Sequence, residues 1–388
     1  MLHRFLTGGE SHGPALTVII EGMPAGLPLP EEAINADLVR RQGGYGRGGR
    51  MRIEKDAVEV LGGVHNGVTT GGPIVFRIEN RDYANQQKRA QPRLTAPRPG
   101  HADLVGTTKY RLPDMRLALE RSSARETAAR VAAGAVARAL LAQFGIQVGS
   151  YVNSIGNVTA TIPEGDPASL REATEASDLR CPDPVATEAM RGLVDNARRT
   201  GDTIGGVFTV WATGLPVGLG SYVHYDRKLD GRLAGAVMSI QAIKGVEIGP
   251  AFENSTHTGR EVHDQIYAGP DGPYRRTNRS GGLEGGVTTG LPLIVRAAMK
   301  PISTTIKPLT TVDMATGEET PTTYQRSDFC AVPAAGVVGE AMVAWVLAEA
   351  LHEKLGGDSL AEMLERWPLP AYPHFDPEPA EAEGAGTG

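Results

Sequence analysis

The sequence contains little cysteine and little lysine. Two cysteines in 388 residues, Cys181 and Cys330, are too few for a disulfide framework, and no C-x-x-C motif of the common zinc sites is present. We therefore expect two inert thiols and no metal site. Only eight of the 39 basic residues are lysine. Arginine, whose planar guanidinium matches carboxylates and phosphates, supplies most of the positive charge.

Other absences narrow the class of protein. We expect no membrane-spanning helix, because no uninterrupted apolar run comes close to the roughly 18 residues that span a bilayer. The N-terminus has no apolar stretch of the secretory type. A cytoplasmic protein without a membrane contact is therefore predicted. The net charge of -6 argues against a general nucleic-acid binder. No G-x-G-x-x-G motif opens a helix after a strand, so a Rossmann cofactor site is not indicated.

Two long helices are predicted in a chain of mixed α and β structure. Ser123 and Glu126 have the spacing of a capping box, an alanine-rich segment follows, and Gly145 ends it. The second helix begins near Pro333 and ends before Gly356. A shorter helix is predicted from Pro184 to about Arg199, and "GGVFTVWATG" and "VEVLGGV" are typical of strands. The regular alternation of a doubly wound fold is missing.

An internal repeat predicts two related halves. "HNGVTTGGPIVFRIEN" (65–80) and "EGGVTTGLPLIVRAAM" (284–299) share G-V-T-T-G-x-P before an apolar run. Chance similarity between two Gly/Thr turns is the alternative. Two irregular stretches, 81–113 and 250–282, are long enough to be functional loops or disordered. The tail 368–388 is rich in Pro, Gly, Glu and Ala and is predicted to be disordered.

The segment "GESHG" (9–13) fits G-x-S-x-G, the nucleophile elbow of serine hydrolases. An elbow needs a strand before the serine and a helix after it, whereas the context here is strand, loop, strand. We therefore predict that Ser11 is not a nucleophile, and a polar turn without chemistry is the other alternative. His12 and His101 lie in polar loops, where a side chain that titrates near neutrality can move protons.

Arginine clusters suggest an anionic ligand. "RRQGGYGRGGRMRIEKD" (40–56) is either a flexible loop over a charged ligand, a solvated basic loop or an RGG-type RNA-binding tract. In "ERSSARET" (120–127), arginines and serines surround a helix N-terminus, which favours phosphate, although an ordinary capping box has the same pattern. The residues alone thus indicate an enzyme for a phosphorylated small molecule, and they do not name the reaction.

Six segments resemble the motifs of one family, chorismate synthase, in order from residue 9 to about 345. They are "GESHGPALTVIIEGMPAG", "RRQGGYGRGGRMRIEKD", "RPGHAD", "ERSSARETAARVAAGAVAR", "SGGLEGGVTTGLPLIVRAAMKPIST" and "RSDFCAVPAAGVVGEAMVAW". The resemblance implies an α+β fold, a single β-α-β sandwich domain (1–367) with an internal duplication, assembled as a homotetramer. It implies a lyase of the shikimate pathway of aromatic amino-acid biosynthesis. Its reaction is the anti 1,4-elimination of phosphate from 5-enolpyruvylshikimate 3-phosphate, which gives chorismate and uses reduced FMN without net redox change.

The resemblance also implies roles for individual residues. His12 protonates the departing phosphate, His101 handles the proton of the reduced flavin, and Ser11 and Asp328 support a relay near flavin N5, which takes the C6 proton. The expected substrate clamps are Arg41, Arg47, Arg50, Arg98 and Arg125. The expected FMN contacts are Arg121, Ser122, Ser123, Gln241, Ala242, Gly285, Lys300, Pro301, Ile302, Ser303, Thr304 and Arg326.

The source of the reduced flavin is also implied. "QGGYGRGGR" resembles the monofunctional bacterial branch, which receives reduced flavin from a separate flavin reductase. In this family, the positions of Arg41 and Arg47 are sometimes assigned to NADP binding. For this chain we expect NADPH to serve only as an indirect reductant, not as a bound cofactor.

Overall fold

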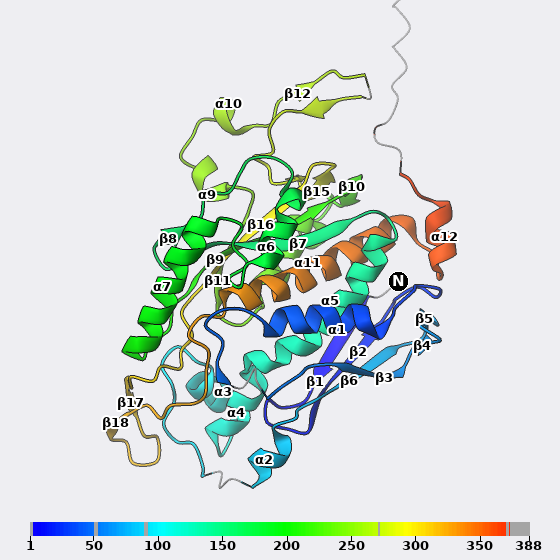
Figure 1. The fold of residues 1–388 in the computed structure, drawn as a ribbon. Coiled ribbons are helices and arrows are strands. Elements are labelled where there is room, and N and C mark those ends of the chain that lie inside the picture. The colour runs from blue at the N-terminus through cyan, green and yellow to red at the C-terminus, as the bar shows by residue number, and fades with distance from the viewer. Residues whose placement is uncertain (1–2, 50–52, 89–91, 271, 370–371, 373–388) are drawn as a thin grey trace, which may run out of the picture.

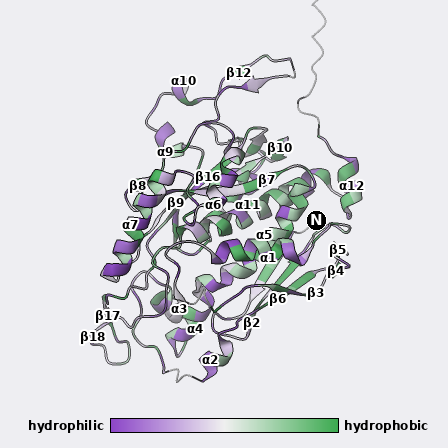
Figure 2. Cartoon of the chain, viewed as in Figure 1, coloured by the Kyte–Doolittle hydropathy of each residue, from purple (hydrophilic) through white to green (hydrophobic). Residues whose placement is uncertain are grey.

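Two antiparallel sheets enclose long helices in the computed structural model, which describes residues 3–49, 53–88, 92–270, 272–369 and 372 (Figure 1). Strand β2 (Ala15–Glu21) shows why the first sheet forms. Its alternate side chains Leu16, Val18 and Ile20 are buried, and Val18 lies opposite Phe76 of β6 (Ile74–Glu79). This alternation gives the sheet one apolar face, which the helices cover. Figure 2 shows the apolar residues concentrated in these strands and central helices.

The remaining elements follow in chain order. The first half adds β1 (Arg4–Gly8), α1 (Glu31–Gln42), β3 (Val58–Gly62), β4 (Val64–His65), β5 (Val68–Thr69), α2 (Tyr83–Gln87), α3 (Asp103–Tyr110), α4 (Met115–Ser122), the 3-10 turn η2 (Ala124–Glu126) and α5 (Thr127–Ala142). The second half consists of β7 (Gln147–Ile155), β8 (Val158–Thr159), η3 (Pro167–Leu170), α6 (Arg171–Ala176), α7 (Pro184–Thr200), β9 (Gly206–Thr213), β10 (Val217–Gly220), η4 (Tyr225–Arg227), α8 (Leu229–Met238), β11 (Ile243–Ile248), α9 (Ala251–Asn254), α10 (Gly259–Val262), β12 (Ile266–Tyr267), β13 (Tyr274–Arg275), β14 (Leu283–Glu284), β15 (Val287–Thr289), β16 (Leu293–Met299), β17 (Thr310–Val312), β18 (Glu319–Pro321), α11 (Val332–Leu355) and α12 (Leu360–Glu365).

The two halves repeat one topology. The first sheet has the strand order β1-β2-β6-β3, and the second contains the corresponding order β7-β9-β16-β11. Along the chain, helix α1 lies between β2 and β3 in the first half, and helix α8 lies between β9 and β11 in the second. A long helix, α5 or α11, ends each half. Helices α5 and α11 pack side by side between the sheets, so the fold is an α+β sandwich of two related halves (Figure 1).

Side-chain contacts repeat as well, which excludes chance similarity of the two G-V-T-T-G segments. Buried Thr69 donates a hydrogen bond to the Pro24 carbonyl and accepts one from the Leu27 amide, at 2.6 and 2.9 Å. Its counterpart Thr288 binds the Pro216 carbonyl and the Leu219 amide in the same way, at 2.6 and 2.8 Å. Each threonine thus ties its hairpin to the segment that follows the second strand.

Helix α11 corrects one expectation from the sequence. Its 24 residues have a mean hydropathy of 1.6 over an 18-residue window, which is long and apolar enough to cross a membrane. The window is 94% buried inside the protein, however. The helix is therefore the central core helix, and its apolar character comes from packing against α5 and both β7 and β9.

The predicted capping box at Ser123 and Glu126 is wrong. Ser123 Oγ accepts from the Arg125 amide at the start of η2, while Glu126 turns away to bind Thr7 and Gln241. The two stretches predicted as irregular contain short elements, α2 and α3 in the first and α9, α10, β12 and β13 in the second. Most of the predicted tail, 370–371 and 373–388, lies outside the described residues.

Candidate active site

One cavity of about 540 Å³ lies where the two halves meet. Its walls come in corresponding pairs of segments. The end of α1 and the loop after it match the loop after α8, and the loop after β6 matches the one after β16. The starts of α5 and α11 form the third pair. The cavity therefore lies on the pseudo-twofold axis of the duplication, and each half supplies one side of it.

Two helix N-termini make the cavity favourable for anions. Ser123, Ala124 and Thr127 at the start of α5 line it, as do Ala331 and Ala335 at the start of α11. Each helix brings the positive end of its dipole to this wall. Among the described residues, six cationic side chains line the same cavity, namely Arg41, Arg47, Arg98, Arg125, Lys300 and Arg326.

Two of these arginines are held from behind by one carboxylate. Arg125 Nη1 lies 2.6 and 2.7 Å from the two carboxylate oxygens of Asp56, and Arg41 Nη1 lies 3.3 Å from Oδ2. Arg41 also donates to Thr127 Oγ1 at 2.9 Å, and Arg125 to Asn80 Oδ1 at 2.8 Å. Burial lowers the pKa of Arg41 to about 9, a shift that Asp56 opposes, so its charge persists at neutral pH. Most donors of Arg125 are occupied by protein.

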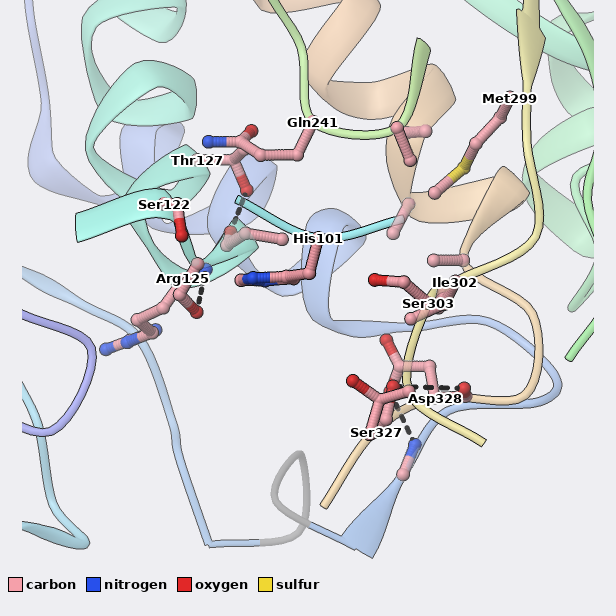
Figure 3. Close-up of a pocket in the computed structure, with 18 of the residues that line it drawn as sticks. His101, Ser122, Arg125, Thr127, Gln241, Met299, Ile302, Ser303, Ser327 and Asp328 are labelled. Carbon is pink, nitrogen blue, oxygen red and sulfur yellow. Dashed lines mark hydrogen bonds between the residues drawn. The ribbon is translucent and has the colours of Figure 1, made fainter. Parts of the chain in front are cut away.

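Two more arginines each pair with a carboxylate on a different loop. Arg47 Nη1 lies 2.8 Å from Asp328 Oδ2, and Asp328 Oδ1 accepts from the Gly48 amide at 2.6 Å. Arg326 donates to Asp82 at 2.6 Å. The contacts of Asp328 join the loop after α1 to the segment before α11, and the Arg326–Asp82 contact joins the loop after β6 to the same segment. Asp328 and Ser327 face the cavity from the side opposite Arg125 (Figure 3).

His101 lines the cavity together with Arg98, and Asp103 holds both. Asp103 Oδ1 lies 2.6 Å from His101 Nδ1, and the carboxylate binds Arg98 through Nε at 2.7 Å and Nη2 at 2.9 Å. Burial alone would raise the pKa of Asp103, but its bonds to His101 and Arg98 prevail and hold it well below the usual range. Arg98 Nη1 also reaches Thr304, which ties this loop to the one after β16.

Ser11 and His12 are placed beside the cavity, not on its wall. Ser11 is buried, and its Oγ accepts from Ser123 Oγ at 3.1 Å. His12 Nδ1 lies 2.8 Å from Glu120 Oε1, and its backbone amide donates to Oε2 at 2.7 Å. Burial would raise the pKa of Glu120, but these bonds to His12 lower it overall. Strand β2 follows Ser11 where an elbow would need a helix.

The cavity gathers most of the residues expected to contact FMN. Those that line it are Ser122, Ser123, Gln241, Ala242, Lys300, Ile302, Ser303, Thr304 and Arg326. Arg121 instead binds Thr7, and Pro301 lies between two lining residues without lining the cavity itself. Gly285 lies in the β14–β15 hairpin, at the far end of β16, about 20 Å of strand away. Arg50 lies outside the described residues.

The site also contains residues that the sequence analysis did not single out. Carboxylates behind the cations and histidines are Asp56, Asp103 and Glu120, and Thr127 holds Arg41. All four lie inside the quoted motifs, so composition offered a signal, but their partners are distant in sequence. An apolar wall of Ile240, Met299, Ile302, Ala334 and Val338 completes the cavity. Side chains of this kind accept a flat ring.

A duplicated β-α-β sandwich with one cation-lined cavity at its seam is the fold and site of an enzyme for a small, multiply charged substrate. The family model described as chorismate synthase matches residues 3–352. A chorismate synthase of Desulforamulus reducens is 57% identical over 374 residues, covering 94% of this chain and 97% of that protein. One of Chlorobaculum tepidum is 54% identical over 384 residues, covering 94% and 96%. A crystal structure of chorismate synthase superposes with a TM-score of 0.78 at 45% identity, covering 94% of this chain and 96% of that one.

The chain therefore belongs to the chorismate synthase family. It is a carbon–oxygen lyase that removes phosphate to give chorismate, in the biosynthesis of aromatic amino acids. The resemblance of the six motifs and the predicted fold class are confirmed by these matches.

Proposed function

We propose that the cavity binds 5-enolpyruvylshikimate 3-phosphate beside reduced FMN and eliminates the phosphate in an anti 1,4 sense. The observation that carries this proposal is the charge of the wall. In the part of the chain that the structure describes, six cationic side chains and two helix N-termini surround one lining carboxylate, Asp328, in a chain whose net charge is -6. A substrate with two carboxylates and a phosphate needs such a wall, which lowers the free energy of the bound polyanion.

The arginines divide the work by how they are held. Arg47 and Arg98 each pair with one carboxylate and line the cavity, so they are proposed to contact the anions of the substrate, Arg98 while it is held by Asp103 and Thr304. Arg41 and Arg125 are nearly fully buried around Asp56, so they act as fixed positive charges below the site. Arg50 is proposed to join the clamp on the basis of the motif alone. Fixed donors cost no reorganisation when the leaving phosphate gains charge.

The residues present fit a flavin. Ile240, Met299 and Val338 provide an apolar wall for a flat ring, and Ser122, Ser123, Lys300 and Thr304 provide donors for a phosphate tail. The Oε1 atom of Gln241 is buried and has no hydrogen-bond partner among the described residues, so it retains an unused acceptor. Reduced FMN bound here would supply electron density that helps to break the C–O bond, and the elimination returns it.

Proton transfer is assigned to the two histidines. His12 would protonate the leaving phosphate, and His101 would hold or release the proton of the reduced cofactor. Ser11 and Asp328 would support the path by which the C6 proton leaves the substrate. His101 and Asp328 line the cavity, and Ser11 reaches it through Ser123. His12 does not line the cavity, so this role requires the leaving phosphate to lie at the edge of the cavity beside the His12 loop.

The wider setting is also proposed. We expect a cytoplasmic homotetramer that receives reduced FMN from a separate flavin reductase, with NADPH acting only through that reductase and no nucleic-acid or membrane partner. We expect residues 1–367 to fold as one domain, because one continuous core includes buried residues from Leu16 to Met363. FMN is expected to bind more tightly when substrate is present, since substrate orders the arginine loops.

Phosphate release tests the reaction. Under anaerobic conditions, purified protein, the shikimate ester and reduced FMN should release phosphate and form chorismate. NADPH with oxidised FMN should give no turnover until a flavin reductase is added. Turnover with NADPH and oxidised FMN alone would contradict the external supply of reduced flavin. No phosphate release with reduced FMN would refute the proposed reaction itself.

Ser11 and His12 separate elimination from hydrolase chemistry. If the elimination holds, Ser11→Ala keeps measurable turnover, while His12→Ala loses about 10² to 10⁴ in kcat and still binds substrate through the arginines. A fluorophosphonate probe should leave Ser11 unlabelled. Labelling of Ser11, or a near-normal kcat in His12→Ala, would overturn these assignments.

A further inference from the structure

Each histidine of the proposed proton path is held by a buried carboxylate from a different helix. Glu120 lies near the end of α4 and is 8% exposed, and Asp103 is the first residue of α3 and is 4% exposed. Both carboxylates contact the Nδ1 atom of the ring, at 2.8 Å for His12 and 2.6 Å for His101. The two histidines lie on different loops, and in both contacts a carboxylate oxygen faces the Nδ1 atom of the ring.

The chemistry of the carboxylate decides where the ring carries its proton. The pKa values of Glu120 and Asp103 both lie below the usual range, so both groups are ionised at neutral pH. An ionised carboxylate can only accept a hydrogen bond, so Nδ1 of each histidine must be the donor. In the neutral ring this leaves the lone pair on Nε2, which in His101 lies 3.3 Å from the donor Arg98 Nη2. Each contact therefore selects the atom that can exchange a proton with a ligand.

Glu120 also fixes the position of the histidine loop. Its backbone carbonyl accepts from the Ser11 amide at 3.1 Å, and its Oε2 accepts from the His12 amide at 2.7 Å. With the bond to His12 Nδ1, one residue makes three bonds to two neighbouring residues of the loop. Asp103 works differently, because it also binds Arg98 through both carboxylate oxygens.

We propose that Glu120 and Asp103 are positioning residues of the elimination, which hold Nδ1–H of His12 and His101 and so leave Nε2 of each ring as the atom that exchanges a proton. The inference rests on the proposed function for its catalytic consequence. It does not depend on that function for the proton position, which is a property of the protein without ligands. Glu120 serves the acid alone, whereas Asp103 serves both a histidine and a substrate arginine.

The first test is the histidine tautomer. In ¹⁵N-histidine-labelled protein at neutral pH, long-range ¹H–¹⁵N correlation spectra distinguish a ring protonated at Nδ1 from one protonated at Nε2. The signals are assigned by their loss in His12→Asn and His101→Asn. We expect both neutral rings to carry the proton on Nδ1 in the wild-type protein. A proton on Nε2 of either neutral ring would overturn the proposal for that histidine, whether or not the enzyme turns over.

The second test separates kcat from KM in phosphate release with reduced FMN. Glu120→Gln should lower kcat about ten- to hundredfold and leave the substrate KM within about threefold, because no substrate arginine is disturbed. Asp103→Asn should lower kcat and also raise KM, because Arg98 loses its partner. Glu120→Asp keeps the charge and should recover part of the lost kcat, and it replaces Glu120→Gln if the latter does not fold.

The chain offers a matched control. His224 Nδ1 lies 2.8 Å from Asp226, a pair of the same geometry that is exposed and lies away from the cavity. Asp226→Asn should leave both kcat and KM unchanged. A kcat within twofold of wild type in Glu120→Gln would show that Glu120 is only structural. If the wild-type enzyme releases no phosphate, the proposed function fails instead, and the tautomer measurement still decides this inference.

Discussion

Replacing Asp56 by asparagine should destabilise the protein more than any surface charge change. The side chain of Asp56 is fully buried between Arg41 and Arg125, whose side chains are 5% and 2% exposed. Asp56→Asn keeps the size of the side chain and removes the only carboxylate that forms an ion pair with either arginine among the described residues. Breaking a buried ion pair by removing one partner costs about 3 to 5 kcal/mol, since an uncompensated charge stays in the interior.

Urea unfolding at pH 7 measures this loss, and Glu59→Gln is the matched control. Glu59 and Arg77 form an ion pair of 2.9 Å across β3 and β6, with the side chains 58% and 41% exposed. An exposed pair contributes about 0 to 1 kcal/mol, so the control should barely change the free energy of unfolding. If Asp56→Asn loses less than about 1 kcal/mol at an unchanged m-value, the buried arginines are solvated or shift apart, and their role as fixed charges is wrong.

Three further predictions follow from named contacts. Arg47→Ala should raise the substrate KM about 10- to 150-fold with little change in kcat, because it loses a charged hydrogen bond worth about 1.5 to 3 kcal/mol; normal KM with lost RNA binding in a gel shift would favour the RGG-type reading instead. Burial lowers the pKa of His3 from 6.5 to about 3, with the neighbouring His352 as the next cause. The unfolded chain therefore binds the extra proton between these pH values, and urea unfolding should show about 2 kcal/mol less stability at pH 5 than at pH 7, a difference that His3→Asn should abolish. Thr69→Val and Thr288→Val should each lower the free energy of unfolding by about 1 to 3 kcal/mol, and the two losses should add in the double variant. Strong non-additivity would mean that the two hairpins are coupled.

Local signals in the sequence predicted much of the framework. Helix α7 begins at Pro184 as expected and ends at Thr200, one residue beyond the prediction, because Pro184 and Gly201 stop it at either end. Helix α11 likewise contains Pro333 in its first turn and ends before Gly356. The repeated Gly/Thr turn correctly indicated two related halves. Such signals act over a few residues, so the chain carries them without its tertiary structure.

The rest of the site depends on contacts between distant residues. Glu126 has the capping-box spacing from Ser123, yet its carboxylate accepts hydrogen bonds from Thr7, Arg130 and Gln241 instead of from the Ser123 amide. The carboxylates Asp56 and Glu120 were visible inside quoted motifs, but only the fold shows which cation or histidine each one holds. No spacing rule predicts a bond between residues 12 and 120, because the described part of the intervening chain contains strands β2 to β6 and helices α1 to α3.

The place of the cavity on the pseudo-twofold axis limits how the two halves could diverge. A duplication that put a pocket inside each half would leave a spare copy free to change. Here both halves line the same cavity, so the two copies of the repeat form its two opposite walls. The framework positions, such as Thr69 and Thr288, stay equivalent, while the walls differ: one presents His101 and the other Lys300 after the matching strand. Neither half encloses the cavity by itself, so both are needed to form it.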